Sequence, residues 1–347
     1  MPIAALPALL GVCLAGGCPA SQPAAPAPAP SAPAASPAGG SSAAGGSGQA
    51  VARLATALAT DDLLAEPGKE VRLAVALRSS LLVTGVEGKR VQFLLGDTVL
   101  GEATTDKSGS AALAWKVPAT AGDYLIQAQV RAEDQPPRII PPADLLVAAR
   151  AADAPMIAVD LDKTVVASGF ARVLLGMAEP MAGSSDVLAR VAKTQTVIYL
   201  TQRPDFLGPD SKKWLADKGF PRGPMLTTTL ATLVEGSGAY KSHRLAEIRK
   251  TFKNVTIGIG DKPSDAQAYA DNGLRPILIL GAKWSDDDPE YFEKMAREVA
   301  ALPDSTQVVT GWGEVAAVLF EKADHPKKAM EDRLREAAGK LRAKGKG

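Results

Sequence analysis

The stretch Met156-Ile-Ala-Val-Asp160-Leu-Asp162-Lys-Thr164 decides the fold of this chain. Its first four residues are apolar, which is typical of a strand buried on both faces of a parallel sheet. Two carboxylates, Asp160 and Asp162, then follow on either side of one leucine. Open α/β sheets bind their ligands at the carboxyl ends of their strands. Because Mg²⁺ prefers oxygen ligands and would offset two carboxylates in one pocket, the stretch indicates a magnesium site for phosphoryl transfer.

Aspartates after a strand are also common in turns and helix caps, so this stretch alone leaves a structural role open. Two further apolar runs, residues 197–200 and 255–260, predict strands that also end in polar residues. Between them lies a predicted helix over residues 242–251. The polar residues associated with these elements are Thr201, Gln202 and Arg203 after the first run, Lys241 before the helix, and Asp261 and Asp265 after the second run.

The order of these motifs resembles that of the haloacid dehalogenase-like (HAD) phosphatases. The chain shows strand-Asp-x-Asp-x-Thr, strand-Thr, Lys and strand-Gly-Asp-x-x-x-Asp in that sequence over residues 156–320. The resemblance implies a Rossmann-like α/β domain built on a parallel sheet. It also implies a phosphatase that uses Mg²⁺ and forms an aspartyl-phosphate.

The resemblance assigns a role to each motif residue. Asp160 would be the nucleophile, and Asp162 would act as general acid and then as general base. Thr201 would bind the phosphoryl oxygens, and Lys241 would neutralise charge on the nucleophile and the phosphate. The implied metal ligands are Asp160, Asp162 through its backbone carbonyl, Asp261 and Asp265.

Plainer interpretations of three of these residues stay open. Thr201 could cap a helix, Lys241 could be a solvated helix residue, and Asp265 could be a charge that stabilises a helix N-terminus. Lys250 and Lys253 are alternatives to Lys241. Lys241 is preferred because it precedes a helix that is expected to pack beside the site.

The middle motif narrows the resemblance. Thr201-Gln-Arg-Pro and residues 219–226 (Gly-Phe-Pro-Arg-Gly-Pro-Met-Leu) are similar to the lipin-type branch and its bacterial phosphatidate phosphatase-like relatives. Met225 replaces the leucine of that branch. Lys163 stands where the branch normally has glycine or an acidic residue, and a solvated loop residue remains an alternative there. The expected substrate-binding residues are Gln202, Arg203 and Lys163.

The spacing of the motifs predicts an active site without a large cap. Residues 165–196 and 204–240 separate consecutive motifs, and neither interval holds a separate domain, since domains rarely fall below about 50 residues. An uncovered site admits a phosphate carried on a bulky body, such as a lipid headgroup, a protein or a polymer. It also excludes water poorly, which disfavours tight discrimination among small metabolites.

The N-terminal residues predict attachment to a bacterial cell envelope. Residues 1–18 are an apolar segment of signal-peptide length, and the small residues before Cys18 resemble a lipoprotein processing site. The segment lacks a positive start, and Cys13 is a poorer second site. Residues 19–51 are almost entirely Pro, Ala, Ser and Gly, which predicts a disordered linker. We therefore expect a lipid-anchored protein on the periplasmic side or the outer surface; a soluble protein with an apolar end is the alternative.

Residues 52–150 predict an all-β sandwich between the linker and the α/β domain. Short alternating apolar runs are separated by turns rich in Gly, Asp, Lys and Ser. These runs are residues 70–77, 90–95, 99–103, 111–115 and 124–130. The segment resembles the immunoglobulin-like (Ig-like) modules of bacterial envelope proteins. It offers no titratable cluster, so we interpret it as a spacer or a binding module.

The α/β domain is expected to span residues 151–325, followed by a basic tail over residues 326–347. Further strands are predicted at 276–280 and 307–309, and helices at 291–301 and 314–322. We expect the tail to be solvated; an amphipathic helix on anionic lipid is the alternative. The net charge of +1 removes the case for bulk nucleic-acid binding.

Two functions of different class follow from the sequence. The first is a Mg²⁺-dependent phosphatase of the envelope, acting on phosphatidate or a related phosphomonoester. The second is a non-catalytic module that binds phospholipid headgroups or phosphorylated ligands through a retained metal pocket. A degenerate binder would be expected to lose the nucleophile or the acid, and Asp160 and Asp162 are both present. The catalytic interpretation is therefore favoured.

Overall fold

The structure is a computed structural model that describes residues 56–79, 84–135, 139–167, 178–229, 232 and 236–344. The leader and linker expected over residues 1–51 lie outside these ranges. No helix within the described ranges combines the length and the apolar character needed to cross a bilayer.

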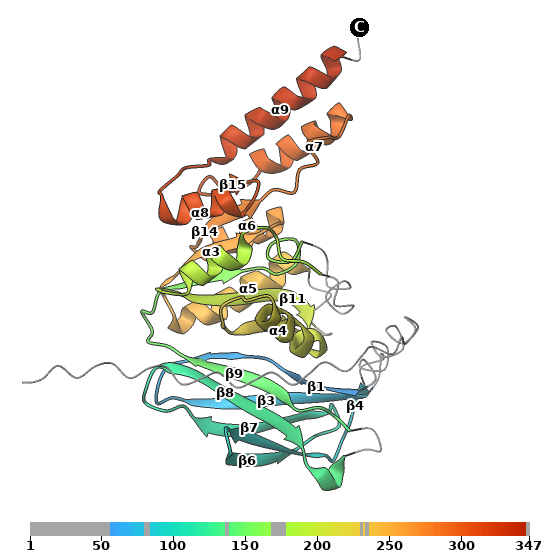
Figure 1. Cartoon of the computed structure of the whole chain (residues 1–347), viewed down its shortest axis with the longest axis vertical. Coiled ribbons are helices and arrows are strands. Elements are labelled where there is room, and N and C mark those ends of the chain that lie inside the picture. Colours follow the sequence, from blue (N-terminus) through green and yellow to red (C-terminus); the bar gives the residue numbers. More distant parts are fainter. Residues whose placement is uncertain are drawn as a thin grey trace, which may run out of the picture. The chain divides into compact units, whose positions relative to one another are not determined.

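Residues 56–149, here called the β unit, form two sheets (Figure 1). The first sheet is antiparallel and contains β1 (Thr56–Thr60), β3 (Glu70–Ser79), β4 (Thr84–Gly85) and β7 (Ser110–Lys116). The second has the order β2 (Leu63–Ala65), β9 (Ala143–Ala149), β8 (Gly122–Val130), β5 (Arg90–Leu95) and β6 (Thr98–Thr104). In this second sheet β2 pairs parallel with β9, and the other pairs are antiparallel. A short 3₁₀ helix, η1 (Ala132–Asp134), follows β8.

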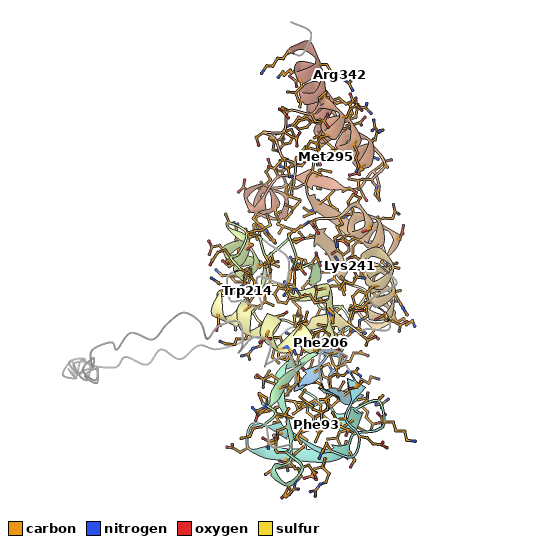
Figure 2. All side chains as sticks on the ribbon, turned by 90° about the vertical axis from the view of Figure 1, so that its right-hand side faces the viewer. Phe93, Phe206, Trp214, Lys241, Met295 and Arg342 are labelled. Carbon is orange, nitrogen blue, oxygen red and sulfur yellow. The ribbon has the colours of Figure 1, made fainter. Side chains whose placement is uncertain are left out.

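The two sheets of the β unit share one apolar core. Alternate residues of β3, such as Leu73 and Leu77, are buried together with Phe93 of β5 and Leu145 of β9. Figure 2 shows Phe93 inside this unit. Because successive side chains of a strand point to opposite faces, the alternation in the sequence is what selects the buried face. The strands predicted from the alternating runs are all present.

The second part of the chain contains a six-stranded parallel sheet, which confirms the predicted α/β fold with a parallel sheet. Its order is β12 (Met225–Thr228), β11 (Thr196–Pro204), β10 (Met156–Val159), β13 (Val255–Gly260), β14 (Arg275–Ile279) and β15 (Gln307–Val309). The chain runs from β10 outward to β12 and then returns to the other side of β10 to form β13. The strand order therefore reverses between β10 and β13, the position where open α/β sheets bind ligands.

Helices cover both faces of the parallel sheet, so this part of the chain has three layers. On one face, Ile157 of β10 lies in an apolar cluster with Leu188 and Trp214. On the other, Ala158 lies in a cluster with Leu245 and Tyr269. The helices of the first face are α3 (Ser184–Val191), α4 (Gly208–Asp217) with the preceding turn η2 (Asp205–Leu207), and α8 (Trp312–Phe320). Those of the second are α5 (Ser237–Thr251), α6 (Pro263–Asp271) and α7 (Pro289–Ala300).

The last described element corrects the expectation of a solvated tail. Residues Lys327–Lys344 form a helix, α9, that runs alongside α7 (Figure 1). Its buried residues Met330, Leu334 and Ala338 recur every four positions, which gives a helix one apolar stripe. The apolar stripe that an amphipathic helix would present to lipid therefore packs in the protein core. At its far end, Arg342 pairs with Glu290 at 2.8 Å on α7.

Truncating Leu334 should loosen α7 and α9. Leu334 is fully buried in the cluster that joins these helices, and a buried Leu→Ala change typically costs about 2–5 kcal/mol. We expect Leu334→Ala to lower the opening free energy of α7 amides by that amount in native-state hydrogen exchange. Leu341→Ala, at a partly buried position of the same helix, is the control and should have a smaller effect. Unchanged protection in Leu334→Ala would show that α9 does not pack on α7.

Candidate functional site

Two adjacent strands bring the first motif and the last motif together. Val159, the last residue of β10, is in register with Ile259 of β13. The next residue, Asp160, donates its backbone N–H to the carbonyl of Ile259 at 2.9 Å. Asp160 and Asp261 therefore leave the sheet side by side. Thr201 lies in β11, the neighbour of β10 on its other side.

Lys241 connects the two strand ends. Its Nζ lies 3.0 Å from Oδ1 of Asp160 and 2.7 Å from Oδ2 of Asp265. The side chain is completely buried, and Figure 2 shows it in the interior beside the sheet. Helix α5 begins at Ser237, five residues before the predicted start at 242, so Lys241 lies in its second turn. The interpretation of Lys241 as a solvated residue is therefore wrong.

Three carboxylates surround this lysine. One ligand oxygen each from Asp160, Asp261 and Asp265 lies within 4.8 Å of the others, a geometry that could hold a metal ion. Asp265 is fully buried in the first turn of α6, and its Oδ1 accepts a hydrogen bond from the Ser237 hydroxyl at 3.2 Å. A Cβ on Gly260 would lie only 2.8 Å from Oδ2 of Asp265. The absence of a side chain at Gly260 is what lets this carboxylate approach.

The pKa values show that negative charge is in excess. Burial raises the pKa of Asp160, an effect that Lys241 opposes and Asp265 reinforces. Burial, with the charges of Asp160 and Asp265, raises the pKa of Asp261 to about 6. For Lys241, burial alone would lower the pKa, but the charges of Asp160 and Asp265 outweigh it and the pKa is raised. One ammonium thus lies among three carboxyl groups, and when all three are ionised two negative charges remain uncompensated.

These residues fit a divalent cation. The donor atoms are all carboxylate oxygens, the ligands that Mg²⁺ prefers. The two excess negative charges match the charge of one Mg²⁺. In addition, Oδ1 of Asp261 is buried and has no hydrogen-bond partner among the described residues. A buried polar atom without a partner is costly unless a ligand satisfies it.

The side chain of Asp162 faces a different partner. Arg203 donates two hydrogen bonds to it, from Nε to Oδ2 at 2.9 Å and from Nη2 to Oδ1 at 2.8 Å. Arg203, expected to bind substrate, is only 3% exposed and is held by this pair. Thr201 is also buried, and its hydroxyl accepts a hydrogen bond from the backbone N–H of Arg203 at 3.3 Å. Gln202, between them, is half-buried.

Lys163 is the exposed cation of the first motif. Its φ of 59° lies in the left-handed region, which non-glycine residues adopt at a cost of about 1–2 kcal/mol. The side chain is exposed, whereas the cations of Lys241 and Arg203 are buried against carboxylates. Among the described residues, Lys163 takes no part in the ion pairs of the site, and its side chain is exposed.

Two serines at the site were missed by the sequence reasoning. Ser237 lies one helical turn before Lys241 and binds Asp265, so the four-residue spacing was a usable signal. Ser211 of α4 accepts a hydrogen bond from Nη1 of Arg203 at 2.8 Å. Nothing in the sequence marks Ser211, because its partner is on another element.

A cavity of about 620 Å³ lies elsewhere, and no site carboxylate lines it. It is bordered by residues of the β unit and of α4, among them Asp62, Leu146 and Lys212. The carboxylate cluster described above is therefore not part of this cavity.

Comparison with protein families gives a match over part of the chain. Residues 157–281 match the family model described as "PITM 1-3, LNS2 domain". The match includes all the carboxylates above, Thr201 and Lys241, and it supports the lipin-like HAD branch for this segment. It covers less than half of the chain and does not include the β unit. A comparison with curated proteins found no match.

Several solved structures are only weakly similar to this chain. The Pnkp1/Rnl/Hen1 RNA repair complex has a TM-score of 0.34 and 14% identity, with 39% of this chain and 45% of that chain covered. The S-layer protein SbsC domains 4 and 5 have a TM-score of 0.19 and 13% identity, with 28% of this chain and 51% of that chain covered. The Yersinia pseudotuberculosis adhesin InvE has a TM-score of 0.22 and 14% identity, with 33% of this chain and 32% of that chain covered. The chain thus spans about half or less of these solved chains.

The raised pKa of Asp261 predicts a pH-dependent stabilisation by Mg²⁺. The pKa of Asp261 is about 6 in the folded protein and 3.8 ordinarily. Protonated Asp261 therefore stabilises the ion-free folded state. This stabilisation is complete below pH 3.8 and is lost as the pH rises through 6. Mg²⁺ requires the ionised form, so its affinity should rise over the same range. At 100 times its dissociation constant, Mg²⁺ should raise Tm by roughly 5–10 °C at pH 7.5. At pH 5 the rise should be clearly smaller, and thermal unfolding at the two pH values measures both.

Asp261→Asn is the matched variant for this experiment. Removing the carboxylate removes part of the charge repulsion, so the ion-free variant should unfold at a higher temperature than the parent at pH 7.5. Mg²⁺ should then add little further stability. An equal response to Mg²⁺ in parent and variant would show that Asp261 does not bind the ion.

Proposed function

We propose that this chain is a Mg²⁺-dependent phosphomonoester hydrolase of the HAD type, acting through an aspartyl-phosphate on Asp160. The observation that carries the proposal is the buried pairing of Asp160 with Lys241 inside an acidic cluster at adjacent strand ends. The match of residues 157–281 to the LNS2 domain supports the same class of activity. Both carboxylates of the Asp-x-Asp motif are present, as catalysis requires.

In the first step, a carboxylate oxygen of Asp160 attacks phosphorus, and the bond from phosphorus to the leaving oxygen breaks. Asp162 donates a proton to that oxygen as it leaves. Lys241, held by Asp160 and Asp265, neutralises charge on the nucleophile and the phosphoryl group. The Thr201 hydroxyl donates a hydrogen bond to a phosphoryl oxygen. The product of this step is the aspartyl-phosphate.

In the second step, water attacks the phosphorus of the aspartyl-phosphate. Asp162, now ionised, accepts the proton of the water, and the bond between phosphorus and Asp160 breaks. Inorganic phosphate leaves and Asp160 is regenerated as a carboxylate. Asp162 ends the cycle protonated, ready for the next leaving group.

Asp160, Asp261, Asp265 and the backbone carbonyl of Asp162 would hold the magnesium. When bound, Mg²⁺ supplies positive charge to the phosphoryl oxygens. The residues of the chain make this possible by keeping the pocket buried and acidic, since their two excess charges favour a divalent cation over none.

The proposed substrate is a phosphomonoester on a large body, with phosphatidate or another lipid or macromolecular phosphate of the cell envelope as the main candidates. The short intervals between the motifs support this, because they provide no separate capping domain to enclose a small substrate. Lys163, exposed beside the catalytic pair, would contact the substrate outside the transferred group. Gln202 is proposed to contribute to the same recognition.

Replacing the nucleophile should abolish hydrolysis without unfolding the protein. Asp160→Asn keeps the size of the side chain but removes the attacking carboxylate, so kcat should fall by about 10⁴-fold or more. The assay uses the full chain with Mg²⁺, p-nitrophenyl phosphate, and phosphatidate in vesicles. Asp153→Asn, an exposed carboxylate just before β10, is the control and should retain parental activity.

Circular dichroism of Asp160→Asn should match that of the parent. Full activity in this variant would eliminate the proposed mechanism. A parent chain that binds Mg²⁺ and phosphatidate vesicles but hydrolyses neither substrate would instead identify a non-catalytic phospholipid-binding module.

A further inference from the structure

A line of polar contacts leads from Asp162 to helix α4. Arg203 holds both carboxylate oxygens of Asp162, at 2.8 and 2.9 Å. The third guanidinium nitrogen, Nη1, donates to the hydroxyl of Ser211 on α4 at 2.8 Å. Arg203 and Ser211 are both buried, at 3% and 2% exposure. The direction in which Asp162 points therefore depends on where α4 places Ser211.

The β unit fixes the next residue of the same helix. The ammonium of Lys212 donates to Oδ1 of Asp62 at 2.5 Å, to the carbonyl of Asp144 at 2.9 Å and to the hydroxyl of Thr60 at 3.2 Å. All three acceptors belong to the β unit. A cation that meets three fixed acceptors has little freedom to shift, so the β unit holds α4 at the point where Ser211 reaches Arg203.

Two more contacts hold the start of α4 against the β unit. Arg78 of β3 forms an ion pair with Asp205 in the turn η2 that leads into α4, with 3.5 Å between Nη2 and Oδ2. A Cβ on Gly208, the first residue of α4, would lie 3.4 Å from the carbonyl of Thr60, which shows how closely the two backbones approach. The position of the helix is therefore set at more than one point.

Asp62 is itself held on all sides. It is 1% exposed, and its oxygens accept from the backbone N–H of Leu146 at 2.8 Å and of Met225 at 2.9 Å besides Lys212. Leu146 belongs to β9 of the β unit, whereas Met225 belongs to β12 of the parallel sheet. One buried carboxylate thus joins the β unit, the parallel sheet and α4.

We propose that Asp62 and Lys212 are positioning residues for Asp162, and that the β unit is therefore part of the catalytic apparatus rather than a spacer. The inference rests on the proposed function. Its physical basis is that proton transfer needs the acid within hydrogen-bond reach of the leaving oxygen, so a displacement of about 1 Å can cost on the order of 100-fold in rate. A shift of α4 would reach Asp162 through Ser211 and Arg203.

The test compares two substrates with different leaving groups. Phenolate is a poor leaving group and needs a proton from Asp162, whereas p-nitrophenolate leaves readily without one. In Asp62→Asn, which removes the charge that faces Lys212, kcat/KM for phenyl phosphate should fall about 10-fold. For p-nitrophenyl phosphate it should fall less than about 3-fold. Ser211→Ala should give the same pattern, and the double variant should lose little more than either single variant, because both act along one path.

The neighbouring carboxylate supplies the matched control. Asp61 is also at the junction and senses the charge of Lys212, but its hydrogen bonds are with Thr227 of β12 and Arg244 of α5. Asp61→Asn should change the two substrates to the same extent, whatever its effect on stability. Lys212→Met should reproduce the effect of Asp62→Asn, and Lys212→Arg, which keeps the cation, should restore the parental ratio of the two substrates.

Each result decides between the alternatives. A changed ratio in Asp62→Asn and Lys212→Met, but not in Asp61→Asn, supports positioning by the β unit. Equal losses on both substrates in all three variants would overturn it, since the junction would then only stabilise the fold. Should Asp62→Asn fail to fold, the ratio in Ser211→Ala and in the Lys212 pair decides. A parent chain inert to both substrates would refute the proposed function itself and remove the inference with it.

Discussion

The site depends on one buried ammonium, that of Lys241, which lies among more carboxylates than it can neutralise. Lys241 contacts Asp160 and Asp265, and Asp261 lies in the same cluster. A buried charge is tolerated when it is paired, and a buried charge without a partner is costly. The pocket is therefore stable only if protons or a cation supply the missing positive charge. This need connects the fold to the chemistry, because the ion that would stabilise the pocket is also the ion that phosphoryl transfer uses.

The strand order creates this need. Had β13 been added beyond β12, Asp160 and Asp261 would lie on strands separated by two others and could not share an ion. Because β13 pairs with β10, their first residues beyond the sheet are neighbours. Helix α5 then brings Lys241 to both strand ends, and the hydroxyl of the adjacent Tyr240 anchors the helix by donating a hydrogen bond to the carbonyl of Thr227. The site is thus held by the ends of β10 and β13 together with α5 and α6.

The sequence predicted those parts of the site that depend on strands and local motifs. Continuous apolar runs mark buried parallel strands, and a carboxylate just after such a run has only one edge of the sheet to occupy. The start of α5 was misplaced because the first-turn residues Ser237 and Gly238 carry little helical signal. For α9 the sequence favours a solvated tail over an amphipathic helix, because nothing in the sequence shows that its apolar stripe packs against α7.

Other features could not be predicted, since they depend on contacts between distant residues. The family resemblance predicts Arg203 as a substrate-binding residue. Its actual partners, Asp162 and Ser211, lie on two different elements. The sequence pattern of one helix or strand does not predict which residues of other elements an arginine will contact. The choice follows from burial, since a guanidinium removed from water must find acceptors for its donors in the protein.

The β unit solves a problem that the parallel sheet has at its own edge. Strand β12 pairs only with β11, so the backbone N–H groups of Met225 and Thr227 point away from the sheet and need acceptors. Asp62 and Asp61 supply them, at 2.9 Å each. Asp62 is buried and Asp61 is half-buried, so both carboxylates are stabilised by cations, which α4 and α5 provide through Lys212 and Arg244. The same two helices carry Ser211 and Lys241. The contacts that satisfy the edge of the sheet therefore also fix the two helices from which Ser211 contacts Arg203 and Lys241 contacts Asp160.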